Sequence, residues 1–211
     1  ANSRYTVAVG SINWKGERTE YSEPGANVML VAPSSNNTHL SDSIIVSTDV
    51  SGTDGNSSTD YLDFVNGTSA SAPMVSGVIA LMIEANPDLT WRDIQHILVR
   101  SSKKVDSSDE GWFKTFEGRD YNHNYGYGIV NAASAVDLAE KWHNLTADMN
   151  LTEVKLNTGN IIVNEVISDA NDLGVTSEYF VKESIDIETV EIKVNISHNW
   201  RGDLNLFLES P

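Results

Sequence analysis

The chain has 211 residues, of which 40% are hydrophobic and 21% are charged, so it can bury the core of one or two globular domains. Its formal net charge of -16 excludes binding to the phosphate backbone of nucleic acids or to an anionic membrane surface. No apolar run reaches the length of about 18 residues that a membrane span needs, and the absence of cysteine excludes disulfides, thiol catalysis and zinc-thiolate sites.

The first part of the chain alternates strand and helix patterns. Residues 5–10 and 28–32 are short apolar runs that end near Gly or Pro, which is typical of buried strands. Residues 34–60 are rich in Ser, Asn, Asp, Thr and Gly, which predicts a long surface loop around the β-like run 44–46. The segment 69–85 is apolar on all sides and rich in small residues, so we expect a helix that is buried on all sides.

Two further helices follow. Thr90 and Asp93 form a capping-box pattern in front of apolar positions at helical spacing. Asn131 is the expected N-cap of a helix that reaches about Trp142, with Val136 and Ala139 on its inner face.

The remaining residues have a β pattern and a denser negative charge. Residues 1–143 hold 10 Lys or Arg and 18 Asp or Glu, whereas residues 144–211 hold 4 and 12. We therefore place a domain boundary near Asn144. Apolar residues alternate with polar ones in 190–197 and again in 204–208, which predicts an antiparallel hairpin, with two more strands near 161–163 and 179–181. Two paired strands are marginal on their own, so this domain is expected to be truncated or completed by another segment.

The segment from Gly67 to Pro73 lies where the polar loop turns into the apolar helix. A serine at a helix N-terminus is close to unpaired N–H groups and to the positive end of the helix dipole, which stabilise the oxyanion of acyl transfer. The simpler interpretation is that Thr68 or Ser69 only caps the helix.

The order Gly-Thr-Ser-x-Ala-x-Pro at Gly67–Pro73 resembles the nucleophile motif of subtilisin-like serine proteases. Segments 5–23, 81–93, 123–132 and 199–211 resemble, in order, further parts of the kexin and furin proprotein convertase branch. The resemblance implies an α/β fold. Residues 1–143 would be the C-terminal portion of a subtilisin-like parallel-sheet domain with a buried central helix. Residues 144–211 would be part of an antiparallel, jelly-roll-like β-sandwich, the P domain, truncated at its end.

The resemblance implies a role for three residues. Ser69 would be the nucleophile, its backbone N–H would be one donor of the oxyanion hole, and Thr68 would shape that hole. Glu23 matches a glutamate that binds a structural calcium ion; the alternative is an ordinary solvated side chain, because Ca²⁺ needs several oxygen ligands. The implied function is a secretory or extracellular endopeptidase that cleaves protein or peptide precursors after basic residues, usually a pair.

The departures from the family pattern concern the rest of the triad. None of the five histidines lies in the family's His-Gly-Thr setting, and the family's aspartate and oxyanion asparagine are not matched. These groups would precede Ala1, so this chain alone is expected to be incomplete and inactive, and to need the rest of its polypeptide or a complementary chain. The alternative function is a non-catalytic secreted glycoprotein, either a relic of the protease fold or an adhesion module.

Other motifs give weaker signals. Six Asn-x-Ser/Thr sequons occur, of which Asn56, Asn144 and Asn150 are the better glycosylation candidates. Arg201-Gly202-Asp203 matches an adhesion tripeptide, but it also fits a turn, which is the interpretation we prefer.

Overall fold

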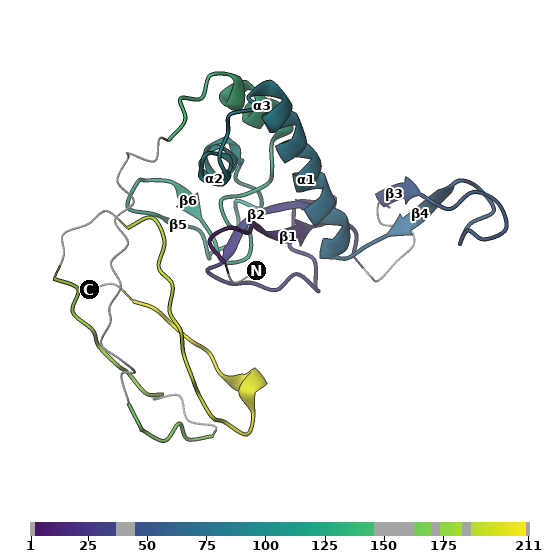
Figure 1. The fold of residues 1–211 in the computed structure, drawn as a ribbon. Helices are drawn as coiled ribbons and strands as arrows, with labels where there is room; N and C mark the ends of the chain where they lie inside the picture. The colour runs from purple at the N-terminus through teal and green to yellow at the C-terminus, as the bar shows by residue number, and fades with distance from the viewer. Residues whose placement is uncertain (1–2, 37–44, 146–162, 170–173, 183–186, 210–211) are drawn as a thin grey trace. The chain divides into compact units, whose positions relative to one another are not determined.

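A computed structural model gives the fold and describes residues 3–36, 45–145, 163–169, 174–182 and 187–209. The chain divides into two compact units, Ala1–Met149 and Asn150–Pro211 (Figure 1). The domain boundary at Asn144 stays a prediction.

A pair of parallel strands forms the centre of the first unit. β1 (Ala8–Ile12) pairs with β2 (Val28–Pro33), with an irregularity between Ala8 and Val9. Both strands were predicted from their apolar runs, and the middle of β2 is fully buried. Residues 127–130 continue the pairing on β2: Val31 N donates to Gly128 O at 2.9 Å, and Val130 N donates to Val31 O at 2.9 Å.

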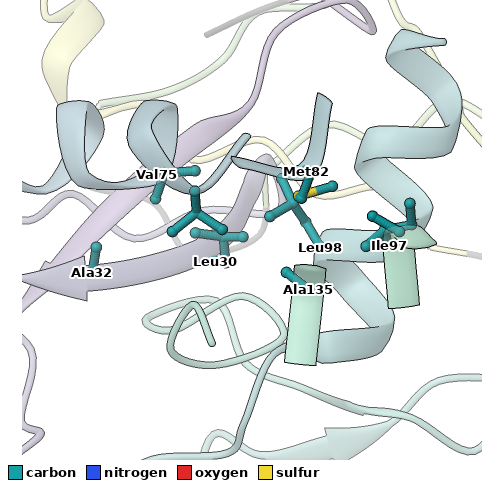
Figure 2. Packing of buried hydrophobic residues seen from close by; sticks show 9 residues of the cluster. Leu30, Ala32, Val75, Met82, Ile97, Leu98 and Ala135 are labelled. Carbon is teal, nitrogen blue, oxygen red and sulfur yellow. The ribbon is translucent and has the colours of Figure 1, made fainter. Parts of the chain in front are cut away.

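Three helices pack together with this strand pair: α1 (Thr68–Ala85), α2 (Trp91–Ser101) and α3 (Ala132–Glu140). All three were predicted, and α3 ends two residues before Trp142. Figure 2 shows side chains of α1, α2 and α3 meeting those of β2. The shared core consists of nine residues: Leu30, Ala32, Val75, Val78, Met82, Ile97, Leu98, Ala135 and Ala139.

The prediction that α1 is buried on all sides is wrong. Its buried residues (Ala70, Ser71, Val75, Val78, Met82) follow one stripe at helical spacing, and this stripe faces the core. The other side carries small or apolar residues that are exposed, with Leu81 at 49% and Ile83 at 42% of their full accessible area. The helix carries apolar residues on all sides, with Glu84 as its one charged residue, although the described part of the chain covers only one of its faces.

Among the helices that the structure describes, α1 alone is long and apolar enough to cross a membrane. A core helix of a globular protein passes the same test. Because the buried stripe of α1 packs on β1, β2 and α3, we interpret it as a core helix.

Asp93 joins the start of α2 to the end of α3. The capping box predicted from Thr90 and Asp93 is present in both directions, and Asp93 is fully buried. Its second carboxylate oxygen accepts hydrogen bonds from Trp142 Nε1 at 2.8 Å and from Leu145 N at 2.7 Å. Burial alone would raise the pKa of Asp93, but the hydrogen bonds from Thr90, Leu145 and Trp142 outweigh it and hold this pKa below its ordinary value of 3.8.

We expect Asp93→Asn to lower the free energy of unfolding at pH 7 by about 2 kcal/mol, because an amide would turn a donor toward Thr90 or toward Trp142. Since the folded pKa lies below the unfolded one, the contribution of Asp93 is present above pH 3.8 and is lost as the pH falls through the folded value. Urea denaturation from pH 2.5 to 7 measures both effects. The exposed Asp88→Asn is the matched control, and an equal loss in both variants would contradict the prediction.

Two short hairpins were missing from the sequence prediction. β3 (Ile45–Thr48) confirms the described part, 45–46, of the β-like run 44–46. Its antiparallel partner is β4 (Tyr61–Val65), a segment for which no strand was predicted. β5 (Phe113–Lys114) pairs with β6 (Asp120–Tyr121). The aromatic and β-branched residues at 61–65 were the overlooked signal for β4.

The predicted hairpin of the second unit is not present as hydrogen-bonded strands. Arg201–Asp203 forms a 3₁₀ turn, which confirms the predicted turn. Residues 163–169, 174–182 and 187–209 contain no strand, so the two paired strands of the hairpin are not confirmed. The physical reason is that, among the described residues, no second layer covers the apolar side chains here: Val190, Ile192, Val194, Leu206 and Leu208 are each more than half exposed. The β-sandwich prediction is therefore not confirmed. The strand expected at 161–163 lies mostly outside the described residues, and 179–181 is described without strand pairing.

Candidate active site

Ser69 lies in the first turn of α1. The N-cap is Gly67, with a φ of 83°, and no side chain caps the helix. The interpretation of Thr68 or Ser69 as a capping residue is therefore wrong: Thr68 is the first helical residue and Ser69 the second. The Ser69 side chain is exposed. A Cβ at position 67 would make only ordinary contacts, 3.7 Å from Ser69 N and 3.9 Å from Ser69 Oγ, so it is the positive φ and not crowding that favours glycine here.

The turn before Ser69 is fixed to the end of β2 by hydroxyl groups. Ser34 Oγ donates to Gly67 O at 2.9 Å, and the Ser34 hydroxyl is itself 2.8 Å from Tyr21 Oη. Ser71 Oγ, which is fully buried, lies 3.0 Å from both Ala32 O and Pro33 O, so these two carbonyls share its single donated proton. These bonds couple the first turn of α1 to the strand on which it packs, so the position of Ser69 is set by β2.

Sequence reasoning missed Tyr21, Ser34 and Ser71 as parts of this site. Ser34 and Ser35 directly follow an apolar strand, and Ser71 interrupts an apolar helix. A hydroxyl in such apolar surroundings needs a hydrogen-bond partner, usually a backbone carbonyl. These serines within or next to apolar segments were therefore the signal that could have identified the contacts.

The backbone N–H of Ser69 is one of the orphan donors of the helix start. It forms no hydrogen bond with another backbone group that the structure describes, whereas the next amide, Ala70 N, bonds to Gly67 O at 3.0 Å. Ser69 thus presents, on one residue, a hydroxyl and an N–H that has no partner among the described residues, at the positive end of an 18-residue helix. This arrangement can support attack on a carbonyl and can donate to the oxyanion that results.

A general base for Ser69 is not found among the described histidines. His96 lies within α2, His123 packs edge-on against Phe113 and Tyr121, and His198 Nδ1 bonds within its own turn at Trp200. His143 is exposed after α3, and His39 lies outside the described residues. In the described part of the chain the Ser69 hydroxyl forms no hydrogen bond to any side chain.

The structure does not bring ligands together around Glu23. Its side chain is exposed, and the described residues contain no group of three acidic or histidine side chains that could hold a metal ion. Ca²⁺ takes six to eight oxygens, so Glu23 alone does not fit a calcium site.

The glycosylation candidates differ in accessibility. Asn56 is exposed in the loop between β3 and β4, whereas Asn144 is half-buried and donates its amide to Asp88 O at 2.5 Å. Asn150 lies outside the described residues.

Comparison with known proteins decides the family. The model of the subtilase family, peptidase S8, matches residues 1–128. The chain belongs to the subtilase family. The resemblance to subtilisin-like proteases stated from Gly67–Pro73 is thereby confirmed.

Similar curated proteins come from the kexin and furin branch. Mouse proprotein convertase subtilisin/kexin type 4 is 35% identical over 210 residues, Kluyveromyces lactis protease KEX1 is 33% identical over 216, and Xenopus laevis furin-1 is 32% identical over 221. Each match covers 100% of this chain but only 31%, 26% and 25% of the relative. The chain thus spans about a third or less of the length of these relatives.

Solved structures of serine proteases share the fold of this subtilase chain. The Aeromonas sobria serine protease matches with a TM-score of 0.59 and 26% identity, over 65% of this chain and 30% of that one. A Pseudoalteromonas arctica protease matches with a TM-score of 0.53 and 34% identity, over 65% and 37%. The subtilisin-like α/β part of the predicted fold is therefore confirmed.

Proposed function

We propose that the protein is a subtilisin-like serine endopeptidase and that Ser69 is its nucleophile. The observation that carries this proposal is the exposed Ser69, with an unpaired backbone N–H, in a first helical turn that Ser34 and Ser71 fix to β2. Membership of the subtilase family and the kexin, furin and convertase relatives support it.

The proposed reaction is peptide hydrolysis through an acyl-enzyme on Ser69. Ser69 Oγ attacks the scissile carbonyl carbon and loses its proton to a base, and the carbonyl oxygen becomes an oxyanion that accepts from Ser69 N–H. Collapse of this intermediate breaks the C–N bond, and the leaving amine takes the proton from the base. Water then attacks the acyl ester and regenerates the serine hydroxyl. Thr68 would shape the oxyanion hole, as the resemblance implies.

The remaining catalytic groups would come from residues that precede Ala1 in the same polypeptide or from a complementary chain. The exposed apolar face of α1, with Leu81 and Ile83, supports this idea, because a helix that is apolar on all sides is normally covered on all sides. This chain by itself would then be inactive, since a triad without its base retains almost none of the triad's contribution.

The proposed substrates are protein precursors with basic residues, usually paired, at the cleavage site. One relative, 32% identical over 213 residues, is named the dibasic-processing endoprotease of Yarrowia lipolytica. The net charge of -16 favours the approach of cationic segments. We further propose that the protein acts in the secretory pathway or outside the cell. Residues 144–211 would be the beginning of a P domain. Glu23 would bind calcium together with carboxylates from outside this chain.

A fluorophosphonate probe tests this function in a protein that includes the residues preceding Ala1. We expect phosphonylation of Ser69 Oγ, found by mass spectrometry of the labelled peptide, and faster cleavage of an Arg-Arg peptide than of its Gln-Gln analogue. Equal cleavage rates would refute the proposed specificity. No labelling of Ser69 in folded protein would refute the peptidase and leave the non-catalytic glycoprotein, which the absence of a described base near Ser69 favours.

A further inference from the structure

A cationic pocket of about 270 Å³ lies between the end of α2 and the β5–β6 hairpin. It shares no residue with the turn that holds Ser69. Four of the chain's 14 Lys and Arg residues line it, against a single carboxylate, so its formal net charge is +3 in a protein of net charge -16. The charged lining residues are Arg100, Lys104, Lys114, Arg119 and Asp120.

The internal ion pairs leave much of this charge uncompensated. Asp120 is shared by two lysines: its oxygens lie 3.0 Å from Lys114 Nζ and 3.7 Å from Lys104 Nζ. The hydrogen bond from Lys114 holds the pKa of Asp120 below its ordinary value, so this carboxylate is ionised at neutral pH. One anion cannot neutralise two lysines, and both ammonium groups keep donors for a further acceptor.

The two arginines of the pocket come from different elements. Arg100 lies over the Trp142 ring, 5.1 Å from its centroid, and pairs with no carboxylate in the described part of the chain. Arg119 pairs only loosely, at 3.5 Å, with Glu117, whose side chain is 73% exposed. The contact with Trp142 holds the Arg100 guanidinium, and the turn between β5 and β6 carries Arg119. Guanidinium groups match carboxylate and phosphate oxygens.

Tyr127 adds a neutral donor to the pocket. Tyr127 is half-buried and lines this polar pocket, and its hydroxyl forms no hydrogen bond to a residue that the structure describes. Burial raises the pKa of Tyr127, so the phenol keeps its proton and can donate it to an acceptor.

We propose that the cationic pocket binds an acidic peptide segment through its carboxylate or phosphate groups. Asp120 pairs with Lys104, which follows α2, and with Lys114 of the hairpin, and Arg100 and Arg119 add one cation from each of these two segments. A single small ion would meet this carboxylate, whereas an extended segment with several anions can contact both sides. The rest of the acidic protein repels such a segment, but that field is screened beyond about 8 Å at physiological salt.

Fluorescence anisotropy of a labelled Asp/Glu-rich peptide with the full-length protein, in 0.15 M salt, tests the proposal. We expect saturable binding that Lys114→Gln/Arg119→Gln weakens about tenfold or more, because two charge-assisted contacts are lost. The control Lys15→Gln/Lys141→Gln removes the same charge outside the pocket and should leave the affinity unchanged. Asp120→Asn should tighten binding, which a damaged fold would not do.

Three competitors identify the anion that is recognised. An Asn/Gln version of the peptide should not compete, a phosphoserine version that competes better would assign the site to phosphate, and inorganic phosphate should compete only weakly. No binding above the Asn/Gln peptide, or equal weakening by both double variants, would overturn the proposal.

Discussion

Ser69→Ala should abolish peptide cleavage by the full-length protein, with a fall in kcat on the order of a millionfold, the loss that removal of the triad serine causes in a subtilisin. The physical reason is that Ser69 supplies the atom that forms the acyl-enzyme, and no other described hydroxyl shares its exposed place at the start of α1. Stability should change by less than about 0.5 kcal/mol, because the Ser69 side chain is exposed and forms no described hydrogen bond.

The matched control is Ser76→Ala on the same helix. Ser76 is also exposed, and its hydroxyl bonds only to Ala72 O, at 3.2 Å, one turn earlier. Steady-state rates on an Arg-Arg peptide and thermal unfolding of both variants separate chemistry from folding. A Ser69→Ala protein that still cleaves this peptide at a tenth of the original rate would remove Ser69 from the mechanism.

Gly128→Ala should destabilise the first unit by about 4 kcal/mol or more, a large part of the stability of an ordinary domain. Gly128 has a φ of 113°, a backbone conformation that residues other than glycine rarely adopt. A Cβ there would lie 2.2 Å from Lys103 O and 2.6 Å from the carbon of the same carbonyl, both backbone atoms. Its carbonyl also accepts from Val31 N, so any shift that relieves the clash disturbs the pairing with β2.

Gly118→Ala separates backbone strain from crowding. Gly118 also has a positive φ, 76°, but a Cβ there would meet nothing within 4 Å. We expect a cost of about 1 kcal/mol from the backbone conformation alone. Chemical denaturation of the two variants side by side gives the difference, and equal costs would show that the contact with Lys103 is not rigid.

Local sequence patterns predicted the elements of the first unit well, because the residues that start and shape each element lie within that element or next to it in the sequence. The apolar runs predicted β1 and β2, the Thr90–Asp93 pattern predicted the start of α2, and Asn131 caps α3 as expected. The second hydrogen-bonding side of Asp93 could not be predicted, because its donors lie about 50 residues further along the chain.

Alternating patterns were a poorer guide where the partner surface matters. The alternating pattern of 190–208 indicates which face of a strand is apolar, but it does not identify the layer that would cover this face. In the described residues nothing covers it. In the same way, the composition of α1 indicates a helix that is covered all round, although only one of its faces is buried.

At the candidate site, the resemblance identified Ser69, but the support for Ser69 had no sequence motif. Ser34 and Gly67 are 33 residues apart, and only the folded turn brings them to 2.9 Å. The same holds for the cationic pocket, whose side chains come from three segments and whose charge is hidden in an acidic composition. Contacts between distant segments follow from the topology, which local patterns do not contain.

The bond between Val130 N and Val31 O also sets an order of events on the ribosome. The second edge of β2 cannot be paired until residue 130 has been made, about 100 residues after β2 itself, which takes about 5 to 20 s at ordinary rates of translation. α1 is complete well before that moment. The strands on which α1 packs are then already made, but α3 (Ala132–Glu140) is not, so a nascent chain carries through this interval the part of the apolar stripe of α1 that α3 covers in the folded unit.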